Sequence, residues 1–203
     1  MQVGVLALQG DYTAHAGALV RAGAEPVLVR KPAALAGLDA LVLPGGESTA
    51  MLHGIAREGF EEPLRRFLAC GRPVLGTCAG AILLARRVTN PAQRSFDALD
   101  IDVERNAYGT QLDSFETTTD AAPGPMGLAS LPAVFIRAPR IVRVGTGVEV
   151  LARVAGEPVL VRSAAIWAAT FHPELTNDGR LLREWLHEPG DSRAAQAPMS
   201  APY

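Results

Sequence analysis

Val74-Leu75-Gly76-Thr77-Cys78-Ala79-Gly80 is the segment from which the architecture of this chain can be inferred. It predicts a buried strand over Val74–Gly76, a sharp turn, and a helix over Gly80–Val88. A cysteine between glycines at such a turn is the thiol version of the Gly-x-Ser-x-Gly nucleophile elbow. The strained turn projects the side chain, and the helix N-terminus favours negative charge on the sulfur. Cys78 is therefore the predicted nucleophile; the alternative is a small buried hydrophobe.

Apolar runs alternate with helical patterns on the N-terminal side of this segment. Strands that are almost continuously apolar and alternate with helices indicate an α/β fold whose mostly parallel sheet is covered on both faces. Functional residues of such sheets gather at the carboxyl ends of the strands, where Gln9-Gly10, Pro44–Ser48 and Thr77–Gly80 fall. The predicted strands are Val3–Leu8, Pro26–Val29 and Asp39–Leu43, and the predicted helices are Tyr12–Ala22, Ser48–Arg57 and Glu61–Cys70.

The second half of the chain has shorter apolar runs joined by turns such as Gly145-Thr146-Gly147. These runs predict added antiparallel strands, which extend the sheet or form a small second one. A last helix is predicted over Asp178–His187, and residues 189–203, rich in Ala, Pro and Ser, are expected to be a disordered tail. Residues 1–188 are expected to form one domain. The expected strands are Ile101–Glu104, Val134–Arg137, Val148–Val154, Pro158–Val161 and Ile166–Phe171.

Composition narrows the class of protein and its partners. The 203 residues, 48% hydrophobic and 20% charged, suit one globular domain with a substantial core. A net charge of −2 with interspersed signs gives no electrostatic footprint for nucleic acid or a membrane surface, so neither is an expected partner. The start lacks the basic region of a signal peptide, and no apolar stretch of about 18 residues suggests a membrane span. We expect a cytoplasmic protein whose Cys70 and Cys78 stay reduced.

A thiol nucleophile needs a base and a group that orients it. His172 directly follows the strand Ile166–Phe171, within Phe171-His172-Pro173-Glu174. Side chains two residues apart on extended backbone point to the same side, and a proline favours extended backbone at the residue before it. We therefore predict His172 as the base and Glu174 as its orienter; a histidine satisfied locally at a strand end is the alternative. The other histidines, His15, His53 and His187, are interpreted as surface or partly buried residues, and Cys70 as a packing residue.

The loop Pro44-Gly45-Gly46-Glu47-Ser48 is the candidate oxyanion-binding segment. Its glycines permit backbone angles that aim N–H groups into a cleft, as acyl transfer requires. The amides of Gly46 and Ala79 are assigned to the oxyanion hole. A plain turn with Ser48 as helix cap is the alternative, and a phosphate-binding loop is disfavoured because the P-loop spacing is missing.

Together, Pro44–Ser48, Gly76–Gly80 and Phe171–Glu174 resemble the class I (triad) glutamine amidotransferases. Further matches resemble one branch of them, the glutaminase subunits of pyridoxal 5′-phosphate synthase. The resemblance covers about residues 2–187. The matching segments are Gln9-Gly10, Glu104-Arg105-Asn106, Asp113-Ser114-Phe115-Glu116, Phe135-Ile136-Arg137-Ala138-Pro139 and His172-Pro173-Glu174-Leu175-Thr176.

This resemblance implies a flavodoxin-like three-layer sandwich and hydrolysis of L-glutamine to L-glutamate and ammonia through a thioester on Cys78, with no cofactor and no metal. The implied partner is the synthase (lyase) subunit, in a large hetero-oligomer, which would combine the ammonia with ribose 5-phosphate and glyceraldehyde 3-phosphate. Gln9 would lie near that interface. The implied glutamine-binding residues are Gly46, Glu47, Ser48, Arg105, Ile136 and Arg137.

Three other functions stay open from sequence alone. The chain could be a related cysteine hydrolase that cleaves glutamyl peptides, or an amidotransferase subunit of another pathway. A regulatory subunit with a vestigial triad is the non-enzymatic alternative. Hydrolysis of free glutamine, and labelling of Cys78 by a glutamine-like electrophile, would distinguish among them.

Overall fold

An eight-stranded sheet forms the centre of the computed structural model, which describes residues 1–105, 114–121, 128 and 130–187. Five neighbouring strands are parallel, and the last three run antiparallel to their neighbours. In spatial order the strands are β2 (Glu25–Val29), β1 (Gln2–Leu6), β3 (Ala40–Leu43), β4 (Val74–Thr77), β13 (Ile166–Ala169), β12 (Glu157–Ser163), β11 (Glu149–Val154) and β8 (Asp120–Ala121).

The five parallel strands have the order of a flavodoxin-like, doubly wound sheet, with the first strand between the second and third. The antiparallel extension follows from tight turns. Ala155 and Gly156, which connect β11 to β12, both have positive φ (50° and 82°), the geometry of a two-residue hairpin turn. The mostly parallel sheet with added antiparallel strands is thus confirmed.

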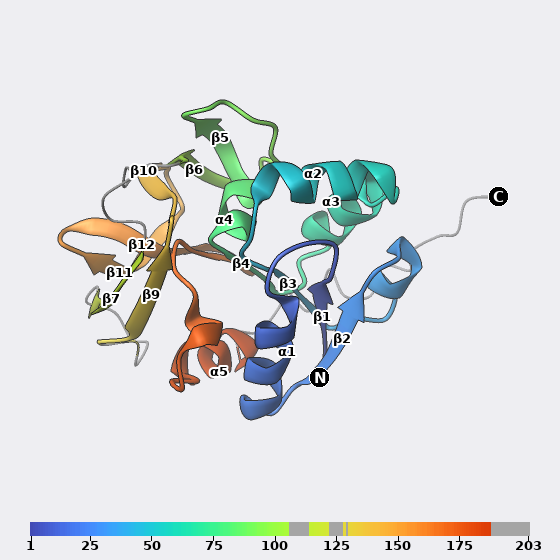
Figure 1. The fold of residues 1–203 in the computed structure, drawn as a ribbon, viewed down its shortest axis with the longest axis horizontal. Helices are drawn as coiled ribbons and strands as arrows, with labels where there is room; N and C mark the ends of the chain where they lie inside the picture. The colour runs from blue at the N-terminus through green and yellow to red at the C-terminus, as the bar shows by residue number, and fades with distance from the viewer. Residues whose placement is uncertain (106–113, 122–127, 129, 188–203) are drawn as a thin grey trace.

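Helices cover both faces of this sheet (Figure 1). On one face lie α1 (Tyr12–Arg21) and α5 (Arg180–His187), and on the other α2 (Ser48–Arg57), α3 (Glu61–Ala69) and α4 (Ala79–Leu84). Alternate residues of one strand supply the two hydrophobic cores, because successive side chains of a strand point to opposite faces. On β3, Val42 packs in the core with Leu19 of α1, and Leu43 packs in the core with Met51 of α2. The predicted three-layer sandwich is therefore present.

Two small sheets lie beside the main one. The first has the order β10 (Arg140–Val144), β6 (Leu99–Glu104) and β5 (Ala85–Thr89), and the second pairs β7 (Ser114–Thr118) with β9 (Pro132–Ile136). Extension of the main sheet and separate small sheets were alternatives from sequence, and the structure contains both.

The predicted helix Gly80–Val88 was wrong beyond its first turn and a half. The helix ends at Leu84, and the following residues form β5, paired in parallel with β6. Along β5, Ala85 and Val88 are buried while Arg86 and Arg87 are exposed. Pairing with β6 outweighs the local helical pattern, as tertiary context often does. The predicted first strand, Val3–Leu8, also ends two residues earlier, at Leu6.

Several predictions fall outside the described residues: Asn106 and Asp113 of the matching segments, and the tail 189–203. Within the described part of the chain, none of the helices is long and apolar enough to cross a membrane.

Candidate active site

The segments singled out from the sequence meet at one edge of the main sheet. Strands β1, β3, β4 and β13 are consecutive parallel neighbours, so their carboxyl ends share that edge. Two glycines allow the loops to touch. A methyl group at Gly10, whose φ is +93°, would overlap the carbonyl oxygen of Gly45, and one at Gly45 would overlap Cε1 of His172. A side chain at Gly10 would therefore displace the loop after β3, and one at Gly45 would displace the base.

Cys78 occupies the strained turn that the sequence predicts. Its φ of 47° and ψ of −102° are rare for a residue with a side chain, and the residue is 6% exposed. Its backbone N–H donates a 2.8 Å hydrogen bond to the carbonyl oxygen of Ala169, which ties the turn to the neighbouring strand β13. Strained backbone conformations of this kind persist where surrounding structure fixes them, and they are typical of active sites.

His172 and Glu174 are hydrogen-bonded, as predicted. Nδ1 of His172 lies 2.7 Å from Oε1 of Glu174, and the backbone N–H of His172 donates to the carbonyl oxygen of Val134 on β9. The backbone argument for this pair was wrong, however. Glu174 lies in a 3₁₀ turn, η2 (Pro173–Leu175), and not on an extended segment. The turn brings the carboxylate under the ring because Pro173 fixes its first position, where a missing N–H costs nothing.

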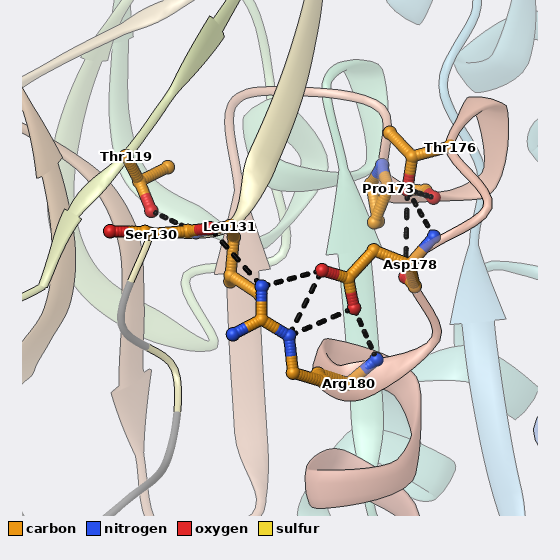
Figure 2. A network of polar contacts seen from close by, with 7 residues as sticks. All are labelled: Thr119, Ser130, Leu131, Pro173, Thr176, Asp178 and Arg180. Atoms are coloured by element: carbon orange, nitrogen blue, oxygen red, sulfur yellow. Dashed lines mark hydrogen bonds and ion pairs between the residues drawn. The ribbon is translucent and has the colours of Figure 1, made fainter.

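Polar contacts beyond η2 fix the chain that follows the turn (Figure 2). The hydroxyl of Thr176 donates to the carbonyl oxygen of Pro173 at 3.0 Å. Arg180 donates to both carboxylate oxygens of Asp178 and, through Nη2, to the carbonyl oxygen of Ser130. The segment that carries Glu174 is therefore attached both to α5 and to the start of β9.

The electrostatics of this pair suit acid–base work. Burial disfavours a charged His172, but hydrogen bonds with Cys78 and Glu174 outweigh it and raise the pKa of His172 from 6.5 to about 10. Burial also opposes ionisation of Glu174, yet hydrogen bonds from His15 and His172 lower the pKa of Glu174 to about 2. At neutral pH the ring is a proton donor held between a sulfur and a carboxylate.

His15 was wrongly interpreted as a surface or partly buried residue. It is fully buried on α1, with Nε2 3.0 Å from the hydroxyl of Thr77 and 3.2 Å from Oε1 of Glu174. A local signal existed: His15 shares its helix face with Ala18 and Leu19, which recur at helical spacing and are buried. Sequence reasoning missed this fourth polar group of the site.

A cavity of about 260 Å³ opens at the same edge of the sheet. Its volume is slightly below the roughly 300 Å³ at which pockets for drug-sized ligands begin, so it suits a small ligand. All six glutamine-binding candidates line it, together with the nucleophile and the base; Glu174 and Ala79 are not in its lining. The lining residues are Gln9, Gly46, Glu47, Ser48, Cys78, Ile82, Arg105, Ile136, Arg137, Pro139 and His172.

The loop after β3 is held by side chains on both sides. The backbone N–H of Glu47 donates to Oε1 of Gln9 at 2.8 Å, and the Glu47 carboxylate accepts from the N–H groups of Thr49 and Ala50. Glu47, and not Ser48, is thus the cap of α2. Arg105 reaches this cap, with Nη2 3.3 Å from Oε1 of Glu47 and 3.2 Å from the hydroxyl of Thr49. The guanidinium is therefore held beside the cavity that it lines.

The remaining candidates lie at the cavity mouth. Ile136 and Arg137 are exposed, and Arg137 has a φ of 42°, which is unusual for a residue with a side chain. The carbonyl oxygen of Ile136 lies 3.9 Å from Sγ of Cys78. The second cysteine, Cys70, lies away from this mouth and donates its thiol to the carbonyl oxygen of Phe67, and both cysteines are free thiols.

Comparison with known proteins agrees with this geometry. The sequence profile of the SNO glutamine amidotransferase family matches residues 5–189. Pyridoxal 5′-phosphate synthase subunit PdxT of Koribacter versatilis (strain Ellin345) is 54% identical over 187 residues, which cover 92% of this chain and 94% of that relative.

Solved structures show the same arrangement of elements. One described as a glutamine amidotransferase superposes with a TM-score of 0.84 at 48% identity, covering 91% of this chain and 96% of its own. A chain from the structure of PurLQS from Thermotoga maritima superposes with a TM-score of 0.63 at 16% identity, covering 91% of this chain and 97% of its own. At that identity the second likeness concerns the fold alone.

Proposed function

Because the chain belongs to the SNO glutamine amidotransferase family, we propose that it hydrolyses L-glutamine to L-glutamate and ammonia, with Cys78 as nucleophile, His172 as acid and base, and Glu174 as orienter. The observation that carries this assignment is the order of carboxylate, imidazole and thiol at the cavity: Nδ1 of His172 lies 2.7 Å from Oε1 of Glu174, and His172 and Cys78 line the same cavity. It is the order that nucleophile activation requires.

The first half of the reaction releases ammonia. The sulfur of Cys78 attacks the side-chain amide carbon of glutamine, and His172 takes up the thiol proton as the carbon–sulfur bond forms. The tetrahedral intermediate collapses when His172 donates that proton to the departing nitrogen. Ammonia leaves, and the γ-carbonyl stays on Cys78 as a thioester.

The second half regenerates the enzyme. His172, now neutral, takes a proton from a water molecule, which attacks the thioester carbon. The carbon–sulfur bond breaks, glutamate leaves, and the proton on His172 is shared again with the sulfur. Throughout, Glu174 accepts from Nδ1 and so keeps Nε2 of the ring directed at the reacting atoms.

We assign the amides of Gly46 and Ala79 to the oxyanion hole. Ala79 follows the nucleophile at the first position of α4, and Gly46 lines the cavity with a φ of +148° that glycine readily adopts. One such donor lowers the barrier of acyl transfer by about 3 kcal/mol.

Arginines at the cavity suit the other end of a free amino acid. Guanidinium groups pair with carboxylates through two parallel hydrogen bonds, and Arg105 and Arg137 both line the cavity. Glu47 and Thr49 orient Arg105 before any ligand binds, which reduces the entropy lost on binding. Glu47, Ser48 and Ile136 complete the proposed glutamine site.

The ammonia is proposed to serve a synthase (lyase) subunit that builds pyridoxal 5′-phosphate, in a large hetero-oligomer in the cytoplasm. The relative from Koribacter versatilis, 54% identical, is named as a subunit of that synthase. Gln9 lines the cavity and binds the loop after β3, so a partner that contacts Gln9 can act on the site. Two free cysteines are consistent with a reducing compartment.

A coupled assay tests this function. The protein is mixed with the synthase subunit, ribose 5-phosphate, glyceraldehyde 3-phosphate and glutamine, and pyridoxal phosphate is followed by absorbance. We expect product with glutamine and none with the Cys78→Ala variant, while added ammonium salt rescues that variant. Glutamate release without pyridoxal phosphate would assign the enzyme to another pathway. Failure to hydrolyse free glutamine, with no adduct on Cys78 from a diazo-ketone glutamine analogue, would reject the glutaminase itself.

We also propose that residues 1–188 form the catalytic unit and that residues 189–203 lie outside it. The family profile ends at residue 189, in agreement with this boundary. A chain ending at residue 188 is expected to keep the melting temperature and kcat of the full chain, which calorimetry and the ammonia assay would check.

A further inference from the structure

His15 connects the strand that carries the nucleophile to the turn that carries the orienter. It lies on α1, which packs against η2, and Arg21 on the same helix donates to the carbonyl oxygen of Thr176. Its ring lies between Thr77, the residue before Cys78, and Glu174, with both contacts made by Nε2. His15 does not line the cavity, so it has no contact with a substrate there.

The nature of these contacts follows from the carboxylate. An ionised carboxylate only accepts, so the 3.2 Å contact between Nε2 of His15 and Oε1 of Glu174 is favourable when that nitrogen carries a hydrogen. The same oxygen accepts from Nδ1 of His172. The imidazole rings of His15 and His172 therefore both contact Oε1 of Glu174. The hydroxyl of Thr77 lies within hydrogen-bonding distance of the same nitrogen of His15.

Glu174 needs this second donor because of where it lies. Its side chain is fully buried, and among the described residues its other oxygen, Oε2, has no hydrogen-bond partner. A buried carboxylate with too few donors is destabilised, and it relieves that cost by binding a proton or by moving. Either response would release Nδ1 of His172 from its partner.

We propose that His15 is a positioning residue of the glutaminase reaction: its Nε2–H holds the Glu174 carboxylate in the ionised state and position that orient His172. The proposal rests on the catalytic roles of Cys78, His172 and Glu174 proposed above. It adds His15 to the pair of His172 and Glu174, and the hydroxyl of Thr77, the residue directly before Cys78, lies 3.0 Å from the same Nε2. The alternative is that His15 only fills space beneath α1.

Two variants, each with a side-chain amide in place of the imidazole of His15, distinguish a positioning role from a packing role. The glutamine in His15→Gln can place a side-chain N–H near the position of Nε2, whereas the shorter asparagine in His15→Asn is equally polar but cannot reach it. Steady-state kinetics of ammonia release give kcat and KM for each variant. We expect His15→Asn to lower kcat by about tenfold to a hundredfold with KM within about twofold, and His15→Gln to recover most of that loss.

Leu19→Ala is the matched control for packing. Leu19 lies one turn further along the same face of α1, is fully buried, and belongs to a hydrophobic core. We expect Leu19→Ala to lower the melting temperature at least as much as His15→Asn and to leave kcat unchanged at temperatures where both variants are folded.

The outcomes are distinct. Equal kcat values for His15→Gln and His15→Asn, or a kcat loss in Leu19→Ala as large as that in His15→Asn, would overturn the positioning role. If His15→Asn fails to fold, two other variants decide. A wild-type kcat in His15→Leu, which has no N–H, would reject the proposal, whereas a wild-type kcat in His15→Gln together with a lowered kcat in His15→Leu would support it. Cys78→Ala, assayed alongside, separates the two levels: turnover in that variant refutes the catalytic assignment itself, whatever the His15 variants do.

Discussion

The proposed catalytic and substrate-binding side chains come from two unlike regions of the molecule. Cys78 and His172 follow β4 and β13, adjacent strands inside the main sheet whose residues are almost all buried. Arg105 and the pair Ile136-Arg137 come at the ends of β6 and β9, in sheets of three and two strands with alternating exposure. The nucleophile and the base thus follow the most tightly packed strands, and the arginines that suit a carboxylate follow small sheets at the side, while Gly46, Glu47 and Ser48 follow β3 of the main sheet.

This division has a kinetic consequence. Substitutions of Cys78 and His172, which follow the central strands β4 and β13, should lower kcat, because they remove interactions made in the transition state. Substitutions that follow the small sheets should raise KM, because they remove binding shared by the ground state and the transition state. The following variants test that division in order of decreasing effect.

Cys78→Ala should abolish glutamine hydrolysis, with a loss on the order of a thousandfold or more, because no thioester can form. Since Cys78 is small and alanine tolerates the turn only slightly less well, the fold should persist, as circular dichroism would show. Cys70→Ala is the control, because that thiol contacts the carbonyl oxygen of Phe67 and not the cavity. Retained turnover in Cys78→Ala, or selective loss in Cys70→Ala, would show that the wrong cysteine was chosen.

His172→Ala should lower kcat more than Glu174→Gln does. The first removes the group that moves the proton, and the second leaves the ring in place with a weaker partner on Nδ1. We expect a loss on the order of a thousandfold for His172→Ala and tenfold to a hundredfold for Glu174→Gln. Stopped assays of glutamate release at saturating glutamine measure kcat for both variants. A larger loss in Glu174→Gln than in His172→Ala would mean that the negative charge of Glu174 contributes more to catalysis than proton transfer by His172.

Arg105→Ala should raise KM about tenfold, the value of one charge-assisted hydrogen bond, with kcat changed less than about threefold. Arg94→Ala is the matched control, since its side chain is 69% exposed and pairs with Glu61 at 3.7 Å on the surface. Substrate titration of both variants checks this. A kcat loss in Arg105→Ala with unchanged KM would place Arg105 with the catalytic groups and contradict the division between the two regions.

Acid should remove a stabilising contribution of Glu174. Its folded-state pKa of about 2 lies below the ordinary 4.5, so its contribution to stability is complete above pH 4.5 and is lost as pH falls towards 2. For this buried group the loss is on the order of 1 to 3 kcal/mol. The free energy of unfolding by urea should therefore fall less steeply between pH 4.5 and 2 in Glu174→Gln than in the unmodified protein. Parallel curves would show that the carboxylate is not stabilised in the folded state.

The sequence predicted the parts of the site that depend on local backbone. The glycines around Cys78 indicated a strained elbow, and the proline after His172 indicated that the next carboxylate would pair with it, although the turn is 3₁₀ and not extended. The contact of His15 with Glu174 was not predicted, because it depends on the packing of α1 against η2, which is far away in the chain. The main sheet was predictable from continuous apolar strands.

Short strands outside the main sheet were less predictable. The sequence predicts a helix that continues through Val88, and only the pairing of β5 with β6 reveals the strand. β7 alternates only between exposed and half-buried residues, and β10 has a single buried residue, so neither strand carries a strong apolar pattern. Such strands form because of partners elsewhere in the chain, and that information is absent from the local pattern.

The adjacency of β4 and β13 has a consequence for synthesis of the protein. The two strands pair side by side, yet the chain runs through both small sheets and β11–β12 between them. On the ribosome, the elbow of Cys78 emerges long before the segment that bears His172 and Glu174. A nascent or truncated chain that lacks β13 and the following segment therefore holds a thiol without its proton carrier, and glutamine is spared until that segment has been made and has packed beside β4.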